Sequence, residues 1–130
     1  MILFDDQIEA LAHAVIGAAI EVHRILGPGY LETVYEKAMC HELTLRGIPF
    51  ECQLRFDVPY KEITAGEGRF DVIVGGRLVV ELKAVESIAG IHEQQVVSYL
   101  KAKQEKLGLL LNFNVIAMNK GGIHRVIHTR

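Results

Sequence analysis

Two short segments of alternating side chains, separated by a pair of glycines, constrain the fold of this chain more than any other feature. Residues 69–74 and 78–83 each alternate with a period of two, which is the pattern of a β-strand. We therefore expect a hairpin that turns near Gly75 and Gly76. One face of this hairpin is predicted to be apolar and to consist of Phe70, Val72, Val74, Leu78, Val80 and Leu82.

The register of this hairpin decides what its other face carries. If the two glycines formed a simple two-residue turn, Asp71 would face Val80, and the polar and apolar faces would be out of step. A slip of one residue pairs Val74 with Leu78 and Asp71 with Glu81. Burial of the apolar side chains, at about 1.5–3 kcal/mol each, outweighs a preference for one turn type. The slipped register is therefore predicted, with a three-residue loop or a bulge at the turn.

In that register Asp71, Glu81 and Lys83 project from one face of the sheet. A solvated face, on which Arg69 neutralises Asp71, is the ordinary explanation for such charges. Helices are expected to cover both faces of these strands, however, so two adjacent carboxylates would repel each other unless they were protonated or bridged by a cation. Oxygen ligands without His or Cys suit Mg²⁺ or Mn²⁺. A lysine beside such an ion could orient a water molecule or stabilise a phosphate.

Hydrophobic periodicity along the rest of the chain predicts one domain over residues 1–130, of the α+β or mixed α/β class. Asp5 or Asp6 is the expected N-cap of the first helix. The helices are expected over about 6–25, 31–46 and 90–104. The strands are expected over about 50–59, 68–74, 77–85, 107–113 and 123–129.

Composition excludes several classes of protein. The formal net charge is −2, so the chain is not expected to coat nucleic acid through electrostatics alone. No apolar run reaches the roughly 18 residues that span a bilayer, and the first ten residues lack a signal-peptide pattern. Cys40 and Cys52 belong to no zinc-ligand pattern, and we expect both to be buried and reduced. These features predict a cytoplasmic protein.

The residues of the central hairpin also belong to motifs that resemble those of a known enzyme superfamily. GRFD at 68–71, ELK at 81–83 and QVVSY at 95–99 are similar to the GxxD, ExK and QxxxY motifs of RecB-type members of the PD-(D/E)XK nuclease superfamily. GYLETVYE at 29–36 resembles the signature of the GxxExxY protein family. The resemblance covers nearly the whole chain. It implies a restriction-endonuclease-like core, in which helices flank a mixed central sheet.

The resemblance implies a metal site in the hairpin. Asp71 and Glu81 would bind Mg²⁺ or Mn²⁺, and the backbone carbonyl of Leu82 would be a further ligand. Lys83 would position the nucleophilic water. All four residues belong to the GxxD and ExK motifs, which is why they are carried over.

A third carboxylate is implied on the first helix of the superfamily core, and either Glu32 or Glu36 would supply it. These two residues are one turn apart, so one helix face presents both, with Tyr35 beside them. We favour Glu32 because it lies inside the signature, and Glu36 and Tyr35 are then expected near the substrate. A capping or solvated role is the alternative for either carboxylate.

Gln95 and Tyr99 also lie one turn apart, on the third expected helix, with His92 on the same side. In RecB-type nucleases the corresponding Gln and Tyr approach the active site and DNA, so these three residues are predicted to bind substrate. The alternative is a tyrosine packed on the sheet, with Gln95 holding a loop. For His92 a contact at the helix end or to a phosphate is favoured over a metal ligand.

The leading hypothesis is therefore a Mg²⁺- or Mn²⁺-dependent nuclease that hydrolyses phosphodiester bonds of DNA or another nucleic acid by water attack. The domain is small for gripping a duplex, so we expect it to form a homodimer or to act with a partner. The alternative is a catalytically weak or inactive module that keeps the nuclease fold and binds nucleic acid or a protein partner. A purely structural dimer is a third possibility.

Overall fold

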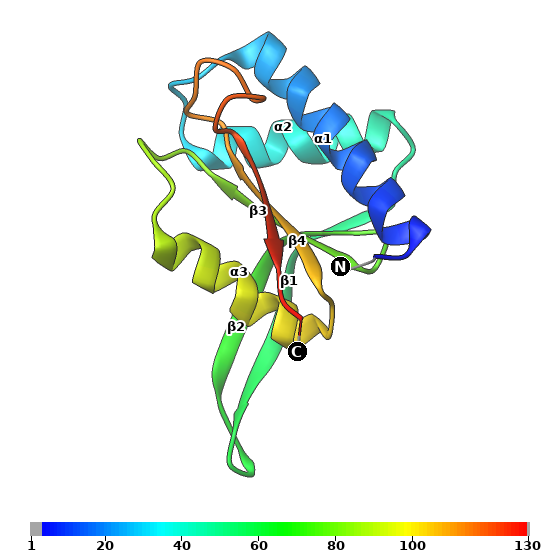
Figure 1. Ribbon diagram of the computed structural model, residues 1–130, viewed down its shortest axis with the longest axis vertical. Helices are drawn as coiled ribbons and strands as arrows, with labels where there is room; N and C mark the ends of the chain where they lie inside the picture. Colours follow the sequence, from blue (N-terminus) through cyan, green and yellow to red (C-terminus); the bar gives the residue numbers. More distant parts are fainter. Residues whose placement is uncertain (1–3, 130) are drawn as a thin grey trace.

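Helices and strands follow the order that the sequence predicts, in a computed structural model that describes residues 4–129 (Figure 1). The three helices are α1 Asp6–Leu26, α2 Glu32–Leu45 and α3 Gly90–Lys103. The strands are β1 Phe50–Tyr60, β2 Ile63–Val74, β3 Leu78–Lys83, β4 Leu107–Asn112 and β5 Ile123–Ile127. The main difference from the prediction is that β2 begins at Ile63 and not near residue 68.

The five strands form one mixed sheet in the order β1-β2-β3-β4-β5. β3 and β4 are parallel, and the other neighbouring pairs are antiparallel. A parallel pair needs a crossover connection, and α3 supplies it. The chain therefore has an α+β fold with a mixed sheet, as expected for a restriction-endonuclease-like core.

Asp5 and Gly27 cap the two ends of α1. The Asp5 side chain accepts a hydrogen bond of 2.9 Å from the Ile8 N–H, which satisfies one of the free amides of the first turn. Gly27 ends the helix with φ 69° and ψ −176°, a positive-φ conformation that glycine adopts because it has no Cβ. The chain then enters the loop that leads into α2.

The turn between β2 and β3 has the predicted slipped register. Val74 pairs with Leu78, and Gly75, Gly76 and Arg77 form a three-residue loop. The Arg77 N–H donates to the Val74 carbonyl at 3.1 Å. The two glycines have φ of 61° and 72°, in the region that favours glycine.

Helices lie over both faces of the sheet (Figure 1), and the sheet separates two clusters of apolar side chains. On one face α1 and α2 cover a cluster that includes Val15 of α1, Leu43 of α2 and Val72 of β2. On the other face α3 covers a smaller cluster that includes Val96 and Leu100. Helices therefore cover both faces of the strands that carry the predicted acidic residues.

Phe70 lies on the opposite face from the one predicted. It packs with Ile73 under α3 and not with Val72 in the larger cluster. Side chains alternate strictly only in a regular strand, and the ladder between β2 and β3 does not extend past Val72. In β1, Gln53 has φ 56° and is skipped in the pairing with β2, which adds a second irregularity at this level.

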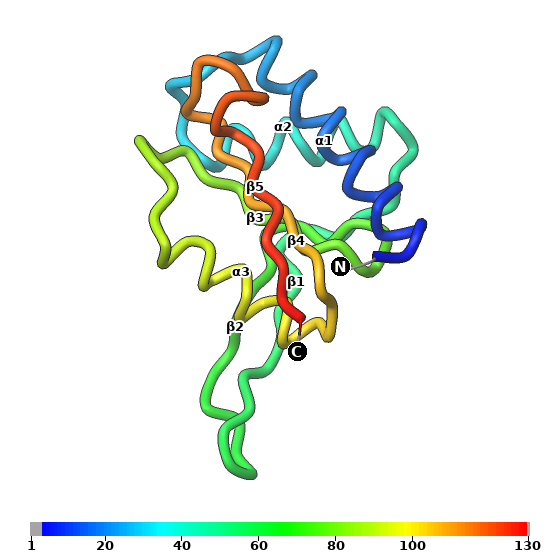
Figure 2. The backbone as a smooth tube through the Cα atoms, viewed as in Figure 1, coloured from blue at the N-terminus to red at the C-terminus, as the bar shows by residue number. Residues whose placement is uncertain are grey.

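The outer parts of β1 and β2, residues 55–60 and 63–69, form a two-stranded arm that extends away from the rest of the molecule (Figures 1 and 2). Lys61 and Glu62 make its turn with φ of 41° and 76°. A two-residue turn with two positive φ angles matches the right-handed twist of a hairpin. The arm exposes Val58, Tyr60 and Ile63.

Both cysteines are free, but the expectation that both are buried is wrong. Cys40 of α2 is half-buried and Cys52 of β1 is exposed. Because β1 is an edge strand, its side chains are covered less than those of the central strands. Burial and the neighbouring Cys52 thiol raise the pKa of Cys40 to about 12.

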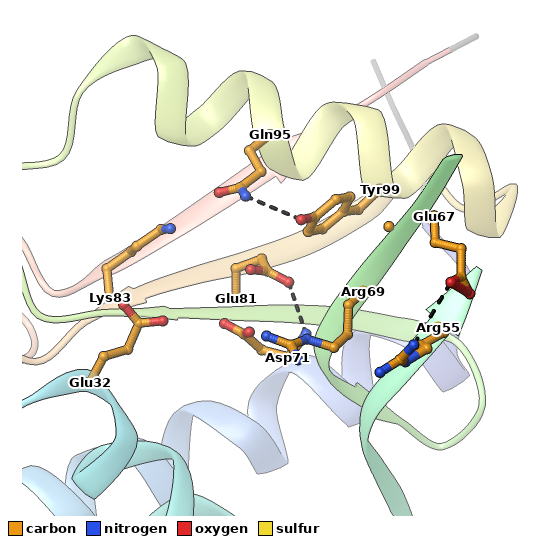
Figure 3. A pocket seen from close by; sticks show the side chains of 10 residues that line it. Glu32, Arg55, Glu67, Arg69, Asp71, Glu81, Lys83, Gln95 and Tyr99 are labelled. Carbon is orange, nitrogen blue, oxygen red and sulfur yellow. Dashed lines mark hydrogen bonds and ion pairs between the residues drawn. The ribbon is translucent and has the colours of Figure 1, made fainter. Parts of the chain in front are cut away.

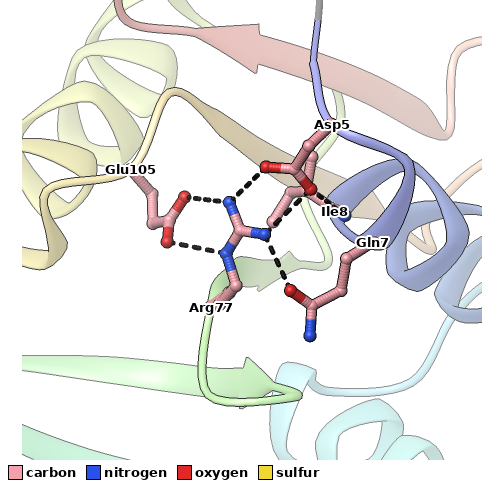
Figure 4. Close-up of polar contacts among 5 residues, drawn as sticks. All are labelled: Asp5, Gln7, Ile8, Arg77 and Glu105. Atoms are coloured by element: carbon pink, nitrogen blue, oxygen red, sulfur yellow. Dashed lines mark hydrogen bonds and ion pairs between the residues drawn. The ribbon is translucent and has the colours of Figure 1, made fainter.

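A cluster of ion pairs around Arg77 holds three distant segments together (Figure 4). Its guanidinium donates to both carboxylate oxygens of Asp5 at 2.9 Å and to both of Glu105 at 3.0 Å. It also donates to the Gln7 side chain at 3.0 Å. The Arg77 side chain lowers the pKa of Asp5 to about 2. The β2–β3 turn is thereby tied to the start of α1 and to the loop before β4.

The C-cap of α3 predicts a stabilising substitution. Gln104 is exposed and has φ 59° and ψ 41°, a left-handed conformation that disfavours a Cβ. Gln104→Gly should raise the free energy of unfolding by about 0.5 kcal/mol, because the relief of strain exceeds the extra chain entropy of glycine. Lys103→Gly, at the neighbouring right-handed position, should lower it by about 0.5–1 kcal/mol. Urea denaturation of both variants measures the effects, and changes of the same sign would contradict the prediction.

Candidate active site

A polar pocket of about 440 Å³ opens at the end of the β2–β3 ladder, between α2 and α3 (Figure 3). Residues of α2, β1, β2, β3 and α3 contribute to its walls. The lining residues are Glu32, Arg55, Glu67, Gly68, Arg69, Asp71, Glu81, Lys83, Gln95 and Tyr99. Six of them are residues that the sequence analysis singled out for the site.

The two carboxylates of the central hairpin meet at this point. The Asp71 N–H donates to Glu81 Oε1 at 3.1 Å, and the Leu82 N–H donates to Asp71 Oδ2 at 3.0 Å. Each carboxylate therefore accepts a bond from a backbone amide of the opposite strand, beyond the last ladder pair of Val72 and Val80. These side chains accept the hydrogen bonds that backbone carbonyls would accept if the ladder continued. Both acidic side chains are therefore held at the point where the pairing of β2 with β3 ends.

Burial gives the Glu81 side chain an unusual pKa. The Glu81 residue is only 2% exposed. Its burial and the negative charge of Asp71 raise the pKa of Glu81 to about 9, against an ordinary value of 4.5. Lys83 acts in the opposite direction with a smaller effect. In the absence of a cation, Glu81 is therefore protonated at neutral pH, which relieves the repulsion between the two side chains.

Of the two candidate helix carboxylates, the structure places Glu32 at the pocket and Glu36 outside it. Glu32 is the first residue of α2, and its burial and the charge of Asp71 raise its pKa. Glu36 accepts a hydrogen bond from the Gln53 side chain and lines a different surface pocket together with Cys40. Although the two residues are one helical turn apart, only Glu32 lines the pocket that contains Asp71 and Glu81.

Tyr35 lies in the core and not at the pocket. It is fully buried, and its ring stacks on Phe113 at a centroid distance of 4.7 Å. Its hydroxyl donates to the Gly27 carbonyl at 2.6 Å and accepts from the Tyr30 N–H at 3.2 Å. The tyrosine of the GxxExxY signature thus holds the glycine loop before α2, because a buried hydroxyl needs such partners.

The helix α3 brings Gln95 and Tyr99 to the pocket and leaves His92 away from it. The Gln95 side chain donates to the Tyr99 hydroxyl at 3.1 Å (Figure 3). Burial and the nearby Glu81 raise the pKa of Tyr99. His92 accepts a hydrogen bond from the Ala89 N–H at 3.0 Å, which is the helix-end contact favoured above over a metal ligand.

Three charged residues of the arm, Arg55, Glu67 and Arg69, line the pocket and were not predicted from the sequence as site residues; Arg69 was considered only as a counter-charge for Asp71. Arg55 and Arg69 are direct partners across the β1–β2 ladder, and Arg55 lies 3.7 Å from Glu67. They were missed because their placement depends on the pairing of β1 with β2, which the sequence analysis did not derive. Within residues 4–129 no ion pair joins Arg69 to Asp71, so neutralisation by Arg69 does not account for that carboxylate.

Asn112 is a further residue whose role was not predicted from the sequence. It is 2% exposed, and its side chain accepts from the Val85 N–H at 3.1 Å and donates to the Val85 carbonyl at 2.9 Å. The next residue, Phe113, donates its N–H to the Lys83 carbonyl at 3.0 Å. These bonds hold the backbone of Lys83 at its carbonyl and two residues further on, at Val85. The available signal was a single amide residue at the end of the apolar run LGLLLN, where a buried polar group requires partners.

Steric contact with Phe56 explains why residue 68, the glycine of GRFD, has no side chain. A Cβ atom on Gly68 would lie 2.2 Å from the ring of Phe56, so the ring covers this backbone position directly. Phe56 in turn packs on Phe70 and Tyr99 at centroid distances of 4.4 and 5.4 Å. The absence of a side chain at residue 68 lets this aromatic cluster form the wall beside the acids.

The donors of the pocket suit a divalent cation. Asp71 and Glu81 offer carboxylate oxygens, which are the ligands that Mg²⁺ and Mn²⁺ prefer. A cation beside the pair would offset the repulsion and burial that raise the pKa of Glu81. In the part of the chain that the structure describes, no three His, Cys, Asp or Glu side chains are close enough together to hold one ion. Glu32 lines the same pocket but does not form a three-ligand cluster with Asp71 and Glu81.

A comparison with family models agrees with this architecture. The model of the PD-(D/E)XK nuclease superfamily matches residues 9–126. The chain belongs to the PD-(D/E)XK nuclease superfamily. Its members generally use divalent metals. A comparison of the sequence with curated proteins found no match. None of its helices within residues 4–129 is long and apolar enough to cross a membrane.

The buried Glu81 predicts that the metal-free protein loses stability as the pH rises. The folded pKa of about 9 exceeds the ordinary value of 4.5, so between these values the unfolded chain binds fewer protons. The free energy of unfolding should fall by up to about 1.4 kcal/mol per pH unit from pH 5 to 9. Glu81→Gln should remove this slope, and Glu93→Gln, at an exposed position on α3, should retain it. Urea denaturation in EDTA measures it, and equal slopes for wild type and Glu81→Gln would contradict the assignment.

Proposed function

We propose that this protein is a divalent-metal-dependent nuclease of the GxxExxY family, which hydrolyses phosphodiester bonds in DNA or another nucleic acid. The observation that supports this most directly is the convergence of Asp71, Glu81 and Lys83 on one pocket. This convergence occurs in a chain of the PD-(D/E)XK nuclease superfamily. Structural acids on a solvated face would not be buried against each other at this cost.

Asp71 and Glu81 would hold the ion, Mg²⁺ or Mn²⁺, with the backbone carbonyl of Leu82 as a further ligand. When bound, the ion would act as a Lewis acid toward the phosphate and would lower the pKa of a coordinated water. Glu81 must lose its proton for this role, because a protonated carboxyl is a poor ligand. Metal binding at neutral pH should therefore release a proton.

The remaining side chains supply binding and orientation. The Lys83 ammonium would orient the attacking water and stabilise negative charge on the phosphate. Attack by the water oxygen would form a new bond to phosphorus and break the ester bond to the leaving oxygen, and the proton that the water loses would pass to that leaving oxygen. Arg69 and the Gln95–Tyr99 pair lie beside these residues and would hold the phosphate backbone.

One observation favours a second candidate, a module that binds nucleic acid without efficient catalysis. Within residues 4–129 the acids do not form a three-ligand cluster. The two candidates differ in what the acids do. A nuclease requires them for metal binding, whereas a binding module would keep its affinity for nucleic acid when they are changed.

Cleavage assays test the proposed activity. Purified protein incubated with Mg²⁺ or Mn²⁺ should cleave single-stranded or duplex DNA or RNA, and EDTA should abolish the cleavage. Lys83→Ala should reduce the rate by roughly 10²- to 10³-fold, the usual effect of removing one group that stabilises transition-state charge. Lys120→Ala removes an exposed lysine outside the pocket and should leave the rate unchanged. Equal cleavage by wild type and Lys83→Ala would count against the proposal.

Calorimetric titration with Mn²⁺ separates the two candidates. Wild type and Asp6→Asn, which changes an exposed acid on α1, should bind the ion. Asp71→Asn should lose the binding, because one carboxylate cannot provide the charge of the pair. Titration in buffers of different ionisation enthalpy should show the proton released by Glu81. Binding of nucleic acid that is insensitive both to metal and to Asp71→Asn would favour the module.

A further inference from the structure

A second hollow adjoins the candidate active site and is chemically different from it. It measures about 360 Å³ and lies between the arm and α3. Phe56, Val58 and Pro59 form its wall on the arm, and Tyr99 and Ala102 form its wall on α3. The walls are mainly aromatic and aliphatic, with Asp57, Ser98 and Lys101 as its polar residues. We call it the arm groove.

The arm groove and the acidic pocket are continuous. Tyr99 and Gly68 line both hollows. The hydroxyl of Tyr99 accepts a hydrogen bond from Gln95 on the pocket side, and its ring packs against Phe56 on the groove side in a T-shaped contact with a centroid distance of 5.4 Å. A ligand that lies along Tyr99 therefore has a charged group within reach of the acids and Lys83 and an apolar group within reach of Phe56.

The wall between the two hollows is held in advance of any ligand. The Phe56 ring lies directly over the Gly68 backbone and packs on Phe70 at 4.4 Å, and Tyr99 contacts Phe70 at 5.6 Å. These contacts restrict the rings to one arrangement. A preformed aromatic surface binds a flat ligand at a low entropic cost.

We propose that the arm groove binds one unpaired nucleobase of the nucleotide next to the cleaved phosphate, so that the substrate is a single strand or the unpaired end of one. This inference rests on the proposed nuclease function. A nucleotide combines the two chemistries that the continuous hollows offer, a phosphate for the polar pocket and a flat apolar ring for the groove. Every base has such a ring, so the contact does not depend on sequence. In an intact duplex each base is stacked between its neighbours and cannot enter the groove.

Charge around the two hollows is consistent with this path. Arg55 and Arg69 line the pocket from the arm, and Lys101 lines the groove from α3. They place cations on both sides of the shared Tyr99 wall, where the sugar-phosphate chain would pass. The overall charge of −2 would not attract nucleic acid by itself, so local cations and base contacts must contribute the affinity.

Fluorescence anisotropy with three probes of equal length tests the proposal: an oligothymidine strand, a strand of abasic deoxyribose phosphates, and a duplex. Ca²⁺ replaces Mg²⁺ to limit cleavage. Stacking of one base contributes about 1–3 kcal/mol, so the oligothymidine should bind about tenfold or more tightly than the abasic strand, and more tightly than the duplex. Equal affinity for the oligothymidine and the abasic strand would overturn the proposal, since phosphate contacts would then explain all of the binding.

A variant that fills the groove gives a second test. Ala102→Leu adds bulk at an exposed groove position on α3, and Gln94→Leu adds the same side chain at an exposed position of that helix outside both hollows. Ala102→Leu should weaken binding of oligothymidine about tenfold without changing binding of the abasic strand, and Gln94→Leu should change neither. Equal affinities of both variants for oligothymidine would overturn the proposal.

The outcomes separate this proposal from the proposed nuclease function. Metal-dependent cleavage or binding that is indifferent to bases would overturn the groove assignment and leave the nuclease in place. Absence of any metal-dependent binding or cleavage would overturn both.

Discussion

The structure depends on one exchange of hydrogen bonds at the end of the central hairpin. The side chains of Asp71 and Glu81 accept hydrogen bonds from the backbone N–H groups of Leu82 and Asp71, respectively, at the place where a backbone ladder would otherwise continue. Side chains thereby replace backbone groups as acceptors, and the strands part without leaving their amides unsatisfied. The same exchange holds two acids together in a buried place, which raises the pKa of Glu81 to about 9. The same two hydrogen bonds thus accompany the end of the β2–β3 pairing and bring the Asp71 charge close to Glu81.

The rest of the fold brings other elements to this opening. The parallel pairing of β3 with β4 requires a crossover, and α3 makes that crossover along the face where Gln95 and Tyr99 meet the acids. On the other side α2 starts at Glu32. Asn112, at the end of β4, bonds the backbone after Lys83 and so stabilises the strand that carries the lysine. The pocket is therefore assembled from residues of five elements, α2, β1, β2, β3 and α3.

The arm contributes both polar and apolar residues to the surface around the site. It contributes Arg55 and Arg69 to the polar pocket and Phe56 to the apolar groove, and Tyr99 lies between the two. Gly68 connects these features, because a side chain there would displace the Phe56 ring. A glycine in the motif that carries the acid therefore shapes the adjoining groove as well. Polar and apolar chemistry meet along one continuous surface, which is the arrangement that a nucleotide requires.

The sequence by itself determined the order of the elements, the slipped register of Val74 with Leu78 and the meeting of Asp71 with Glu81, because local alternation and burial leave one consistent pairing. It also placed Gln95 beside Tyr99, since helical spacing is local. Only the tertiary structure decided that Glu32 and not Glu36 reaches the pocket, that Tyr35 serves the core, that Phe70 turns to the α3 face, and that Arg55 and Arg69 join the site. Each of these outcomes depends on how one element is oriented against another that is distant in sequence, and a periodic pattern within a single element carries no information about that orientation.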